Sequence, residues 1–158
     1  MEHITQKKIG FLGFGSMASA MADGLIRSGG VDAGQLYACA GRYERLLARM
    51  DARGMHACHD AEELLSEVEV AVVALTPNMI ERVLAPLADK LEGKAIVSIA
   101  AGWDFEAYER VLPGTHHLST IPNTPVSICE GVVVAERRHS LAPEERELAM
   151  GLLGLLGI

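Results

Sequence analysis

The sequence predicts an α/β fold: a doubly wound, mainly parallel sheet with helices on both faces. Short apolar, strand-like runs alternate with amphipathic, helix-like segments along the chain, which is the order typical of βαβ units with right-handed crossovers. Of the 158 residues, 49% are hydrophobic but only 4% are aromatic. The core therefore consists mainly of Val, Ile, Leu, Ala and Met, as expected for strands buried on both faces. A glycine-rich turn directly follows the first strand.

Element boundaries follow from hydrophobic periodicity and from glycine, proline and capping residues. Strands are expected at residues 9–12, 36–40, 55–58, 68–75, 95–100, 117–121 and 131–135. Helices are expected at residues 17–27, 43–53, 61–67, 79–91, 105–112 and from 143 to the end, with Asp60, Asn78 and Asp104 as N-caps and Pro86 as a kink or break. A chain of 158 residues fits one domain with a substantial core.

The most informative segment is the turn Gly13-Phe14-Gly15-Ser16-Met17-Ala18. Its first glycine permits a tight turn, its second lets a pyrophosphate approach the backbone, and the small Ala18 lets helix and strand pack closely. Free N–H groups at the helix start then face the phosphates. Because the turn stands between a strand and a helix, it predicts a Rossmann-type dinucleotide-binding domain over residues 1–158.

Ligands of a parallel sheet bind at the carboxyl ends of its strands. This rule selects further segments as candidate cofactor contacts, each at the end of a later strand. They are Gly41-Arg42, Leu75-Thr76-Pro77, Ala100-Ala101-Gly102 and Pro122-Asn123-Thr124.

The end of the second strand bears on which dinucleotide binds. It reads Ala40-Gly41-Arg42 and lacks an acidic residue. A carboxylate there would bind the ribose 2′-hydroxyl of NAD, whereas a guanidinium binds the 2′-phosphate of NADP. The sequence favours NADP, with Arg42 as the 2′-phosphate ligand and NAD as the alternative. In the competing interpretation, Arg42 and Arg45 are ordinary solvated residues at a helix start.

Composition and charge argue against several other partners. The formal net charge is −7, which disfavours nucleic acid because a phosphate backbone binds clustered Lys and Arg. Three scattered cysteines form no disulfide framework and indicate a reducing, cytoplasmic setting. The N-terminus has no signal-peptide pattern, and no apolar run is long enough to span a membrane.

Taken together, four segments resemble the N-terminal half of pyrroline-5-carboxylate reductases. They are residues 10–18, Thr76-Pro77-Asn78, Ser98-Ile99-Ala100-Ala101-Gly102 and Ile121-Pro122-Asn123-Thr124-Pro125. The resemblance implies hydride transfer from NADPH or NADH to a five-membered cyclic imine carboxylate, which gives proline. It also implies that residues 13–18 cradle the pyrophosphate, that Arg42 lies by the adenosine ribose, and that residues 75–77 flank the cofactor. Residues 100–102 and 122–124 would lie beside the nicotinamide.

No catalytic side chain is assigned, because the protein mainly orients the nicotinamide against the imine carbon. Thr76 stands where the family usually has lysine, Ser119 where it usually has arginine, and Ala61 where asparagine is common; Ile121 replaces a methionine. These departures suggest a divergent branch whose substrate differs from the standard one.

The family also carries a helical C-terminal domain that binds the substrate carboxylate and forms the dimer. No matching segment is found in these 158 residues. We therefore expect a cofactor domain of a longer protein, or a truncated relative, that binds NADP(H) but does not turn over alone. A homo-oligomer is expected if the full-length protein carries that domain.

Two clusters invite a chemical interpretation. His56, Cys58 and His59, with Cys39 on the adjacent strand, could begin a zinc site, but a structural site needs four ligands. Buried thiols commonly act as small hydrophobes, so we favour ordinary packing and expect no metal. His116-His117 could donate a proton, but they precede their strand and so lie at the wrong end for the nicotinamide.

Cys129 and Trp103 lie close in sequence to the candidate cofactor contacts. Cys129 has no adjacent cation to lower its thiol pKa, so packing is favoured over a nucleophile. Trp103 follows Ala101-Gly102 and could cover either the cofactor or the core; the sequence does not decide between them.

Two other functions stay open. The same fold could serve another substrate, as in β-hydroxyacid dehydrogenases or deazaflavin-dependent NADP oxidoreductases. Alternatively, the chain could be a non-catalytic nucleotide-binding or regulatory module, which the missing substrate domain and the changed family positions favour.

Overall fold

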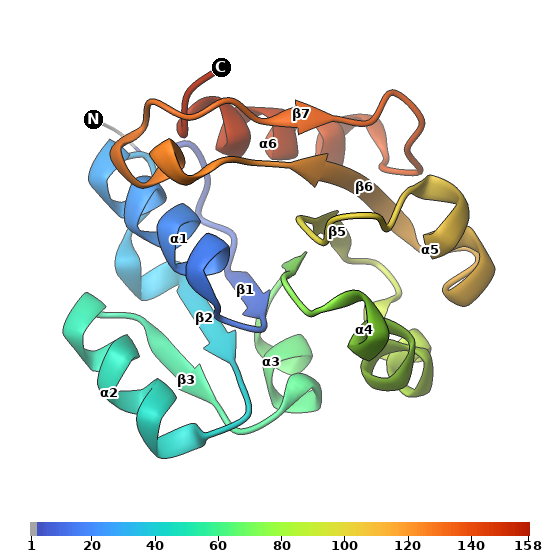
Figure 1. The fold of residues 1–158 in the computed structure, drawn as a ribbon, viewed down its shortest axis with the longest axis horizontal. Helices are drawn as coiled ribbons and strands as arrows, with labels where there is room; N and C mark the ends of the chain where they lie inside the picture. The colour runs from blue at the N-terminus through green and yellow to red at the C-terminus, as the bar shows by residue number, and fades with distance from the viewer. Residues whose placement is uncertain (1–2) are drawn as a thin grey trace.

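The computed structural model describes residues 3–158 and contains a seven-stranded sheet with helices on both faces (Figure 1). The strands are β1 (Ile9–Leu12), β2 (Leu36–Cys39), β3 (His56–Cys58), β4 (Val70–Val73), β5 (Ala95–Ser98), β6 (His116–Ile121) and β7 (Val134–Ala135). Their order in the sheet is β3-β2-β1-β4-β5-β6-β7. All neighbouring pairs are parallel except β6 and β7. The predicted doubly wound, mainly parallel Rossmann-type architecture is confirmed.

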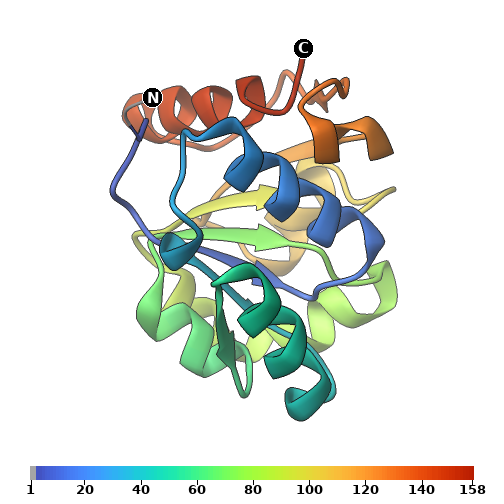
Figure 2. The same cartoon turned by 90° about the vertical axis from the view of Figure 1, so that its left-hand side faces the viewer.

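Helices cover both faces of the sheet. They are α1 (Ser16–Ser28), α2 (Tyr43–Arg53), α3 (Ala61–Glu67), α4 (Pro77–Leu84), α5 (Phe105–Val111) and α6 (Pro143–Gly154), with the 3-10 turns η1 (Ala33–Gln35), η2 (Ala85–Leu91) and η3 (Thr124–Ile128). Apolar side chains of α1, α2 and α6 join one core cluster, and those of α3, α4 and α5 join the other. Figure 2 shows α1 and α6 on the same side of the sheet.

The short strand β1 supplies both core clusters. Ile9 and Phe11 belong to the cluster under α1 and α6, whereas Leu12 belongs to the cluster under α3 and α4, because successive side chains of a strand point to opposite faces. A Cβ on Gly10 would lie 2.9 Å from carbon atoms of the Leu64 side chain. Glycine at this position therefore permits the close approach of α3 to β1.

Local capping signals explain most helix starts. Asp60 accepts the N–H of Glu63 at 2.8 Å, and Asp104 accepts the N–H of Ala107 at 3.0 Å, so both predicted N-caps are confirmed. The N-cap predicted at Asn78 is wrong. Helix α4 begins at Pro77 after Thr76, because the fixed φ of proline suits the first helical position and its missing N–H costs nothing there.

The last strand is shorter than the sequence suggested. A strand is expected over residues 131–135, but β7 contains only Val134–Ala135 and runs antiparallel to β6. Gly131 instead forms a parallel bridge with Gly157. The final residues of the chain therefore pair with the segment that precedes β7.

Candidate functional site

The segments selected from the sequence lie along one edge of the sheet. Residues 13–18 follow β1, 41–42 follow β2, 75–77 follow β4, 100–102 follow shortly after β5 and 122–124 follow β6. These five strands are parallel and stand in the order β2-β1-β4-β5-β6 (Figure 1). Parallel strands end at the same edge, so the segments border the crevice in which such sheets bind ligands.

The two glycines of the turn are needed for different reasons. Gly13 has a φ of +91°, and a Cβ there would lie 2.8 Å from the carbonyl oxygen of Ala74, so the fold itself requires glycine. Gly15 has a φ of −81°, which any residue adopts, and a Cβ there would meet nothing within 4 Å. Neither conformation nor packing demands glycine at position 15. The open space at Gly15 is suited to a group that approaches the backbone closely.

Helix α1 begins beside this open space. Gly15 is its N-cap, and within residues 3–158 no side chain accepts a hydrogen bond at this cap. Gly15 and Ser16 are exposed, Met17 is half-buried, and Ala18 is buried in the core. The first N–H groups of a helix have no intrahelical partner and carry partial positive charge. The turn can therefore receive an anion.

A cavity of about 590 Å³ lies next to the turn. Three of the predicted segments contribute to its wall, through Gly13, Gly41 and Leu75. The other parts of the wall come mainly from the β3–α3 connection and from α4 and η2, and they were not predicted from the sequence. These residues are His59, Asp60, Ala61, Glu62, Met79, Val83, Pro86 and Leu87. The carboxyl-end rule applied to β3 would have found the first four.

Arginines surround the end of β2. Arg42 is exposed and stands at the N-cap of α2. A cavity of about 270 Å³ is lined there by Ala40, Gly41, Arg42, Arg45, Leu46 and Arg49. Arg49 also donates a hydrogen bond of 2.8 Å from Nη1 to the carbonyl oxygen of Phe14. Arg49 was not predicted from the sequence. It lies one turn after Arg45 on α2, so these two side chains share one face of the helix.

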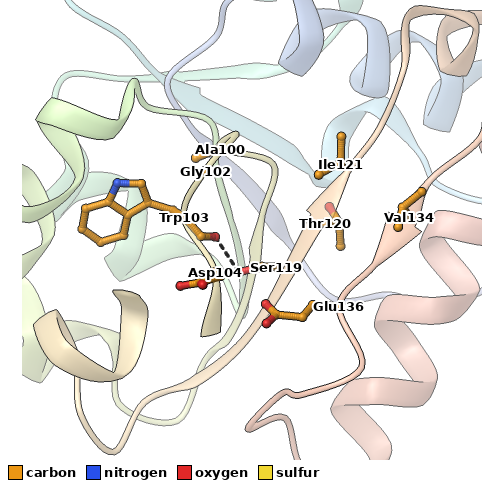
Figure 3. Close-up of a pocket in the computed structure, with 9 residues that line it drawn as sticks. All are labelled: Ala100, Gly102, Trp103, Asp104, Ser119, Thr120, Ile121, Val134 and Glu136. Atoms are coloured by element: carbon orange, nitrogen blue, oxygen red, sulfur yellow. Dashed lines mark hydrogen bonds between the residues drawn. The ribbon is translucent and has the colours of Figure 1, made fainter. Parts of the chain in front are cut away.

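A second region of the edge contains the cavity drawn in Figure 3, of about 370 Å³. It lies between the β5–α5 connection and the β6–β7 pair. Its lining residues are Ala100, Gly102, Trp103, Asp104, Ser119, Thr120, Ile121, Val134 and Glu136. Glu136 accepts the N–H of Phe105 at 2.8 Å, and the Ser119 hydroxyl donates to the Trp103 carbonyl at 2.8 Å. These bonds hold the β5–α5 connection against β6 and the segment after β7.

Trp103 borders both the core and this cavity. Its ring meets Tyr108 edge-on at 5.4 Å between centroids, and the residue packs against the cluster under α3 and α4, to which Tyr108 belongs. In Figure 3 the indole extends away from Glu136 and Val134. Trp103 therefore covers core, while contact with a cofactor stays a prediction.

The predicted residues at 101–102 and 122–124 differ in exposure, and the Asn123 side chain forms a hydrogen bond. Pro122 is buried, whereas Asn123 and Thr124 are exposed. The Asn123 side chain accepts the N–H of Val132 at 2.9 Å. Ala101 is exposed beside Gly102, whose φ is +81°. The structure thus brings all the predicted segments to one edge, but the linings of the 590 Å³ and 370 Å³ cavities, described over residues 3–158, do not include Pro122, Asn123 or Thr124.

The cysteines and His56 make packing contacts. Burial raises the pKa of Cys39 to about 11 and that of Cys58 to about 12. His56 stacks on Tyr37 at 4.6 Å, and its Nε2 lies 3.0 Å from the carbonyl oxygen of Gly34. Over residues 3–158, no group of three His, Cys, Asp or Glu side chains is arranged to hold a metal ion.

His117 and Cys129 lie apart from the glycine turn. His117 stands near the start of β6, fully buried, with Nε2 2.7 Å from Oε1 of Glu109. Burial lowers the pKa of His117 despite the neighbouring carboxylate. The thiol of Cys129 donates to the carbonyl oxygen of Gly24 at 3.2 Å. Both residues take part in packing.

Comparison with known proteins identifies the family. A family model described as "NADP oxidoreductase coenzyme F420-dependent" matches residues 8–102. A pyrroline-5-carboxylate reductase of Treponema pallidum (strain Nichols) is 38% identical over 150 residues, which are 92% of this chain and 57% of that protein. The chain belongs to this family of NADP oxidoreductases and, within it, to the pyrroline-5-carboxylate reductases. Pyrroline-5-carboxylate reductase 3 of Rattus norvegicus is 35% identical over 153 residues, covering 96% of this chain and 56% of the relative.

A solved structure shares the fold. The pyrroline carboxylate reductase of Plasmodium falciparum, determined with NADP bound, superposes with a TM-score of 0.86 at 21% identity, covering 97% of this chain and 56% of that one. The chain thus corresponds to the N-terminal NADP-binding domain of the pyrroline-5-carboxylate reductase family and spans somewhat more than half the length of these relatives. A helix able to cross a membrane is not found among residues 3–158.

Proposed function

We propose that this chain binds NADP(H) along the carboxyl edge of its sheet and presents the nicotinamide for reduction of a cyclic imine carboxylate. The open space at Gly15 carries the proposal, because this glycine is required neither by its backbone conformation nor by its neighbours. An NADP-bound relative of the same fold and relatives named pyrroline-5-carboxylate reductase support it.

Each predicted segment has a role in this proposal. The backbone of residues 13–18 holds the pyrophosphate, Arg42 binds the 2′-phosphate, and the 590 Å³ cavity beside Gly13 and Gly41 takes the adenosine. Residues 75–77 flank the cofactor. Residues 100–102 and 122–124 border the nicotinamide. When bound, the cofactor supplies a hydride to the imine carbon, and a proton from solvent completes the amine.

We expect cofactor binding and substrate binding to depend on different parts of the sequence. Relatives extend well beyond the part that this chain matches. We propose that residues 1–158 are a dinucleotide-binding domain, and that substrate binding and turnover need sequence of the kind those relatives carry outside the match. The purified 158-residue chain is then expected to bind NADPH without forming proline from the imine, and proline formation by this chain would contradict that part.

Titration of the chain with NADPH and NADH tests the cofactor assignment. Tighter binding of NADPH is expected, and Arg42→Met should remove the preference while leaving NADH binding unchanged, because only NADPH carries the 2′-phosphate. Equal or tighter binding of NADH by the unaltered chain would overturn the role of Arg42. Binding of neither dinucleotide would overturn the proposed function.

The family model favours a second candidate. Its description names coenzyme F420, a deazaflavin, so the same domain could exchange a hydride between NADP and a deazaflavin. Reduction of F420 by NADPH, followed by absorbance, distinguishes this candidate from imine reduction. A complete protein that contains this chain, forms proline and does not reduce F420 would exclude the second candidate.

A further inference from the structure

Arg49 links α2 to the turn between β1 and α1. Its Nη1 donates a hydrogen bond of 2.8 Å to the carbonyl oxygen of Phe14, and its guanidinium carbon lies 4.8 Å from the centre of the Phe14 ring. The Phe14 side chain is buried and meets Phe11 edge-on at 5.8 Å. Arg49 itself is half-buried. Phe14 is therefore held at both its side chain and its carbonyl group.

Fixing this carbonyl also fixes the next N–H group. The peptide between Phe14 and Gly15 is trans, as are all peptide bonds in residues 3–158, so its C=O and N–H point in opposite directions. The bond from Arg49 on α2 therefore turns the Gly15 N–H away from α2. Within residues 3–158, the Gly15 N–H makes no backbone hydrogen bond. An oriented, free donor at a helix N-cap suits a phosphate oxygen.

We propose that Arg49 is a positioning residue of the dinucleotide site: by binding the Phe14 carbonyl, it keeps the Gly15 N–H directed at the cofactor's pyrophosphate. The proposal rests on the proposed function, since it concerns the same site. Arg49 acts through the backbone of Phe14, whereas Arg42 is expected to contact the 2′-phosphate itself. The two arginines should therefore affect different parts of the cofactor.

Arg53 provides a matched control. It lies one turn further along α2, with its guanidinium carbon 5.5 Å from the centre of the same Phe14 ring. Its Nε donates to Asp23 at 2.8 Å, and its Nη1 donates to the carbonyl oxygen of Arg49 at 3.2 Å. Arg53→Met removes a cation from the Phe14 ring but leaves the hydrogen bond to the Phe14 carbonyl in place.

The experiment compares three ligands. NADPH, NADH and adenosine 2′-monophosphate are titrated into the unaltered chain and into Arg49→Met, Arg53→Met and Arg42→Met, with thermal unfolding as the check on folding. Only the first two ligands contain the pyrophosphate. Arg49→Met is expected to lower the affinities for NADPH and NADH by the same factor. That factor is about tenfold, which corresponds to the free energy of one charge-assisted hydrogen bond. Binding of adenosine 2′-monophosphate should be unchanged.

The other variants make the result specific. Arg53→Met should bind all three ligands like the unaltered chain. Arg49→Lys, which keeps a cationic donor, should recover part of the NADH affinity lost in Arg49→Met. Arg42→Met should weaken only the two ligands with a 2′-phosphate.

Three results would overturn the proposal: unchanged dinucleotide binding by Arg49→Met, a loss confined to ligands with a 2′-phosphate, or an equal loss in Arg53→Met. Failure of the unaltered chain to bind either dinucleotide is a separate result that overturns the proposed function, and this proposal with it.

Discussion

Gly24 of α1 packs directly against the carbonyl group of Val126 in η3, with no space for a Cβ between them. From the other side, a Cβ on Gly131 would lie 2.8 Å from the backbone nitrogen of Val126. Val126 is completely buried. This contact joins the helix that follows the glycine turn to η3, which begins at Thr124 of the predicted segment 122–124, so two parts of the proposed site depend on it.

Gly24→Ala is expected to destabilise the fold. The added methyl group would have to displace backbone, and such overpacking typically lowers the free energy of unfolding by about 1–3 kcal/mol. Urea denaturation measures the change. Gly34→Ala is the control, because its Cβ would meet only Asp32 Oδ1 at 3.6 Å. A denaturation midpoint of Gly24→Ala equal to that of the unaltered chain would contradict the packing argument.

Gly15→Ala should separate binding from stability. Its methyl group enters open space, so we expect the free energy of unfolding to change by less than about 1 kcal/mol. The same methyl group occupies the approach of the pyrophosphate, so NADPH affinity should fall by about tenfold or more. Gly13→Ala, strained by its φ of +91°, should lose both stability and binding. Titration and thermal unfolding test this, and undiminished NADPH binding by Gly15→Ala would count against the proposed site.

The buried His117 should make stability depend on pH. Its Nδ1 has no hydrogen-bond partner within residues 3–158, and burial lowers its pKa below the ordinary 6.5. Well above pH 6.5 the ring is neutral in both the folded and unfolded states. Below it the unfolded chain takes up a proton that the folded chain resists. The free energy of unfolding therefore falls as the pH drops below 6.5 and towards the lowered pKa of the folded state.

The test measures the melting temperature from about pH 7.5 to about pH 5.5. His117→Gln should show a smaller decrease over this range, although its stability at neutral pH is expected to be lower because a buried contact changes. His3→Gln, at an exposed position, should keep the full decrease. Equal pH dependence of the melting temperature in His117→Gln and the unaltered chain would rule out His117 as its source.

Cys39 and Cys58 should resist alkylation in the folded protein. Their thiols have pKa values raised by burial to about 11 and about 12, and the thiolate is the reactive form. At about pH 8, iodoacetamide should modify both cysteines much more slowly in the native than in the urea-unfolded chain. Mass spectrometry of the peptides reports the rates. Labelling of either cysteine at the unfolded rate under native conditions would contradict its burial.

Elements specified by local patterns could be predicted from the sequence. The N-caps Asp60 and Asp104 lie three residues before the N–H groups that they accept. Such contacts depend on sequence spacing alone. At Asn78 two local signals competed, and Pro77 determined the helix start. The strand expected at 131–135 was too long, since pairing with β6 and with Gly157 divides that segment.

The candidate site, too, could be predicted only in part from the sequence. The carboxyl-end rule located the predicted segments because parallel strands share one edge. Arg49 escaped it because this residue lies within α2 and reaches the site only through the packing of α2 beside Phe14. The wall made by the β3–α3 connection was missed because the rule was not applied to β3, which lies next to β2 in the sheet.

By itself, the sequence determined the order of strands and helices, the Rossmann-type fold and the glycine turn, because these follow from periodicity and from residues adjacent in the chain. The tertiary structure alone decided which glycine the fold requires and which it leaves free, and which arginine holds the turn. Those distinctions arise from contacts between residues that lie tens of positions apart in the sequence. Gly13 is restricted by Ala74, and Phe14 is held by Arg49. Only the folded packing brings such pairs into contact.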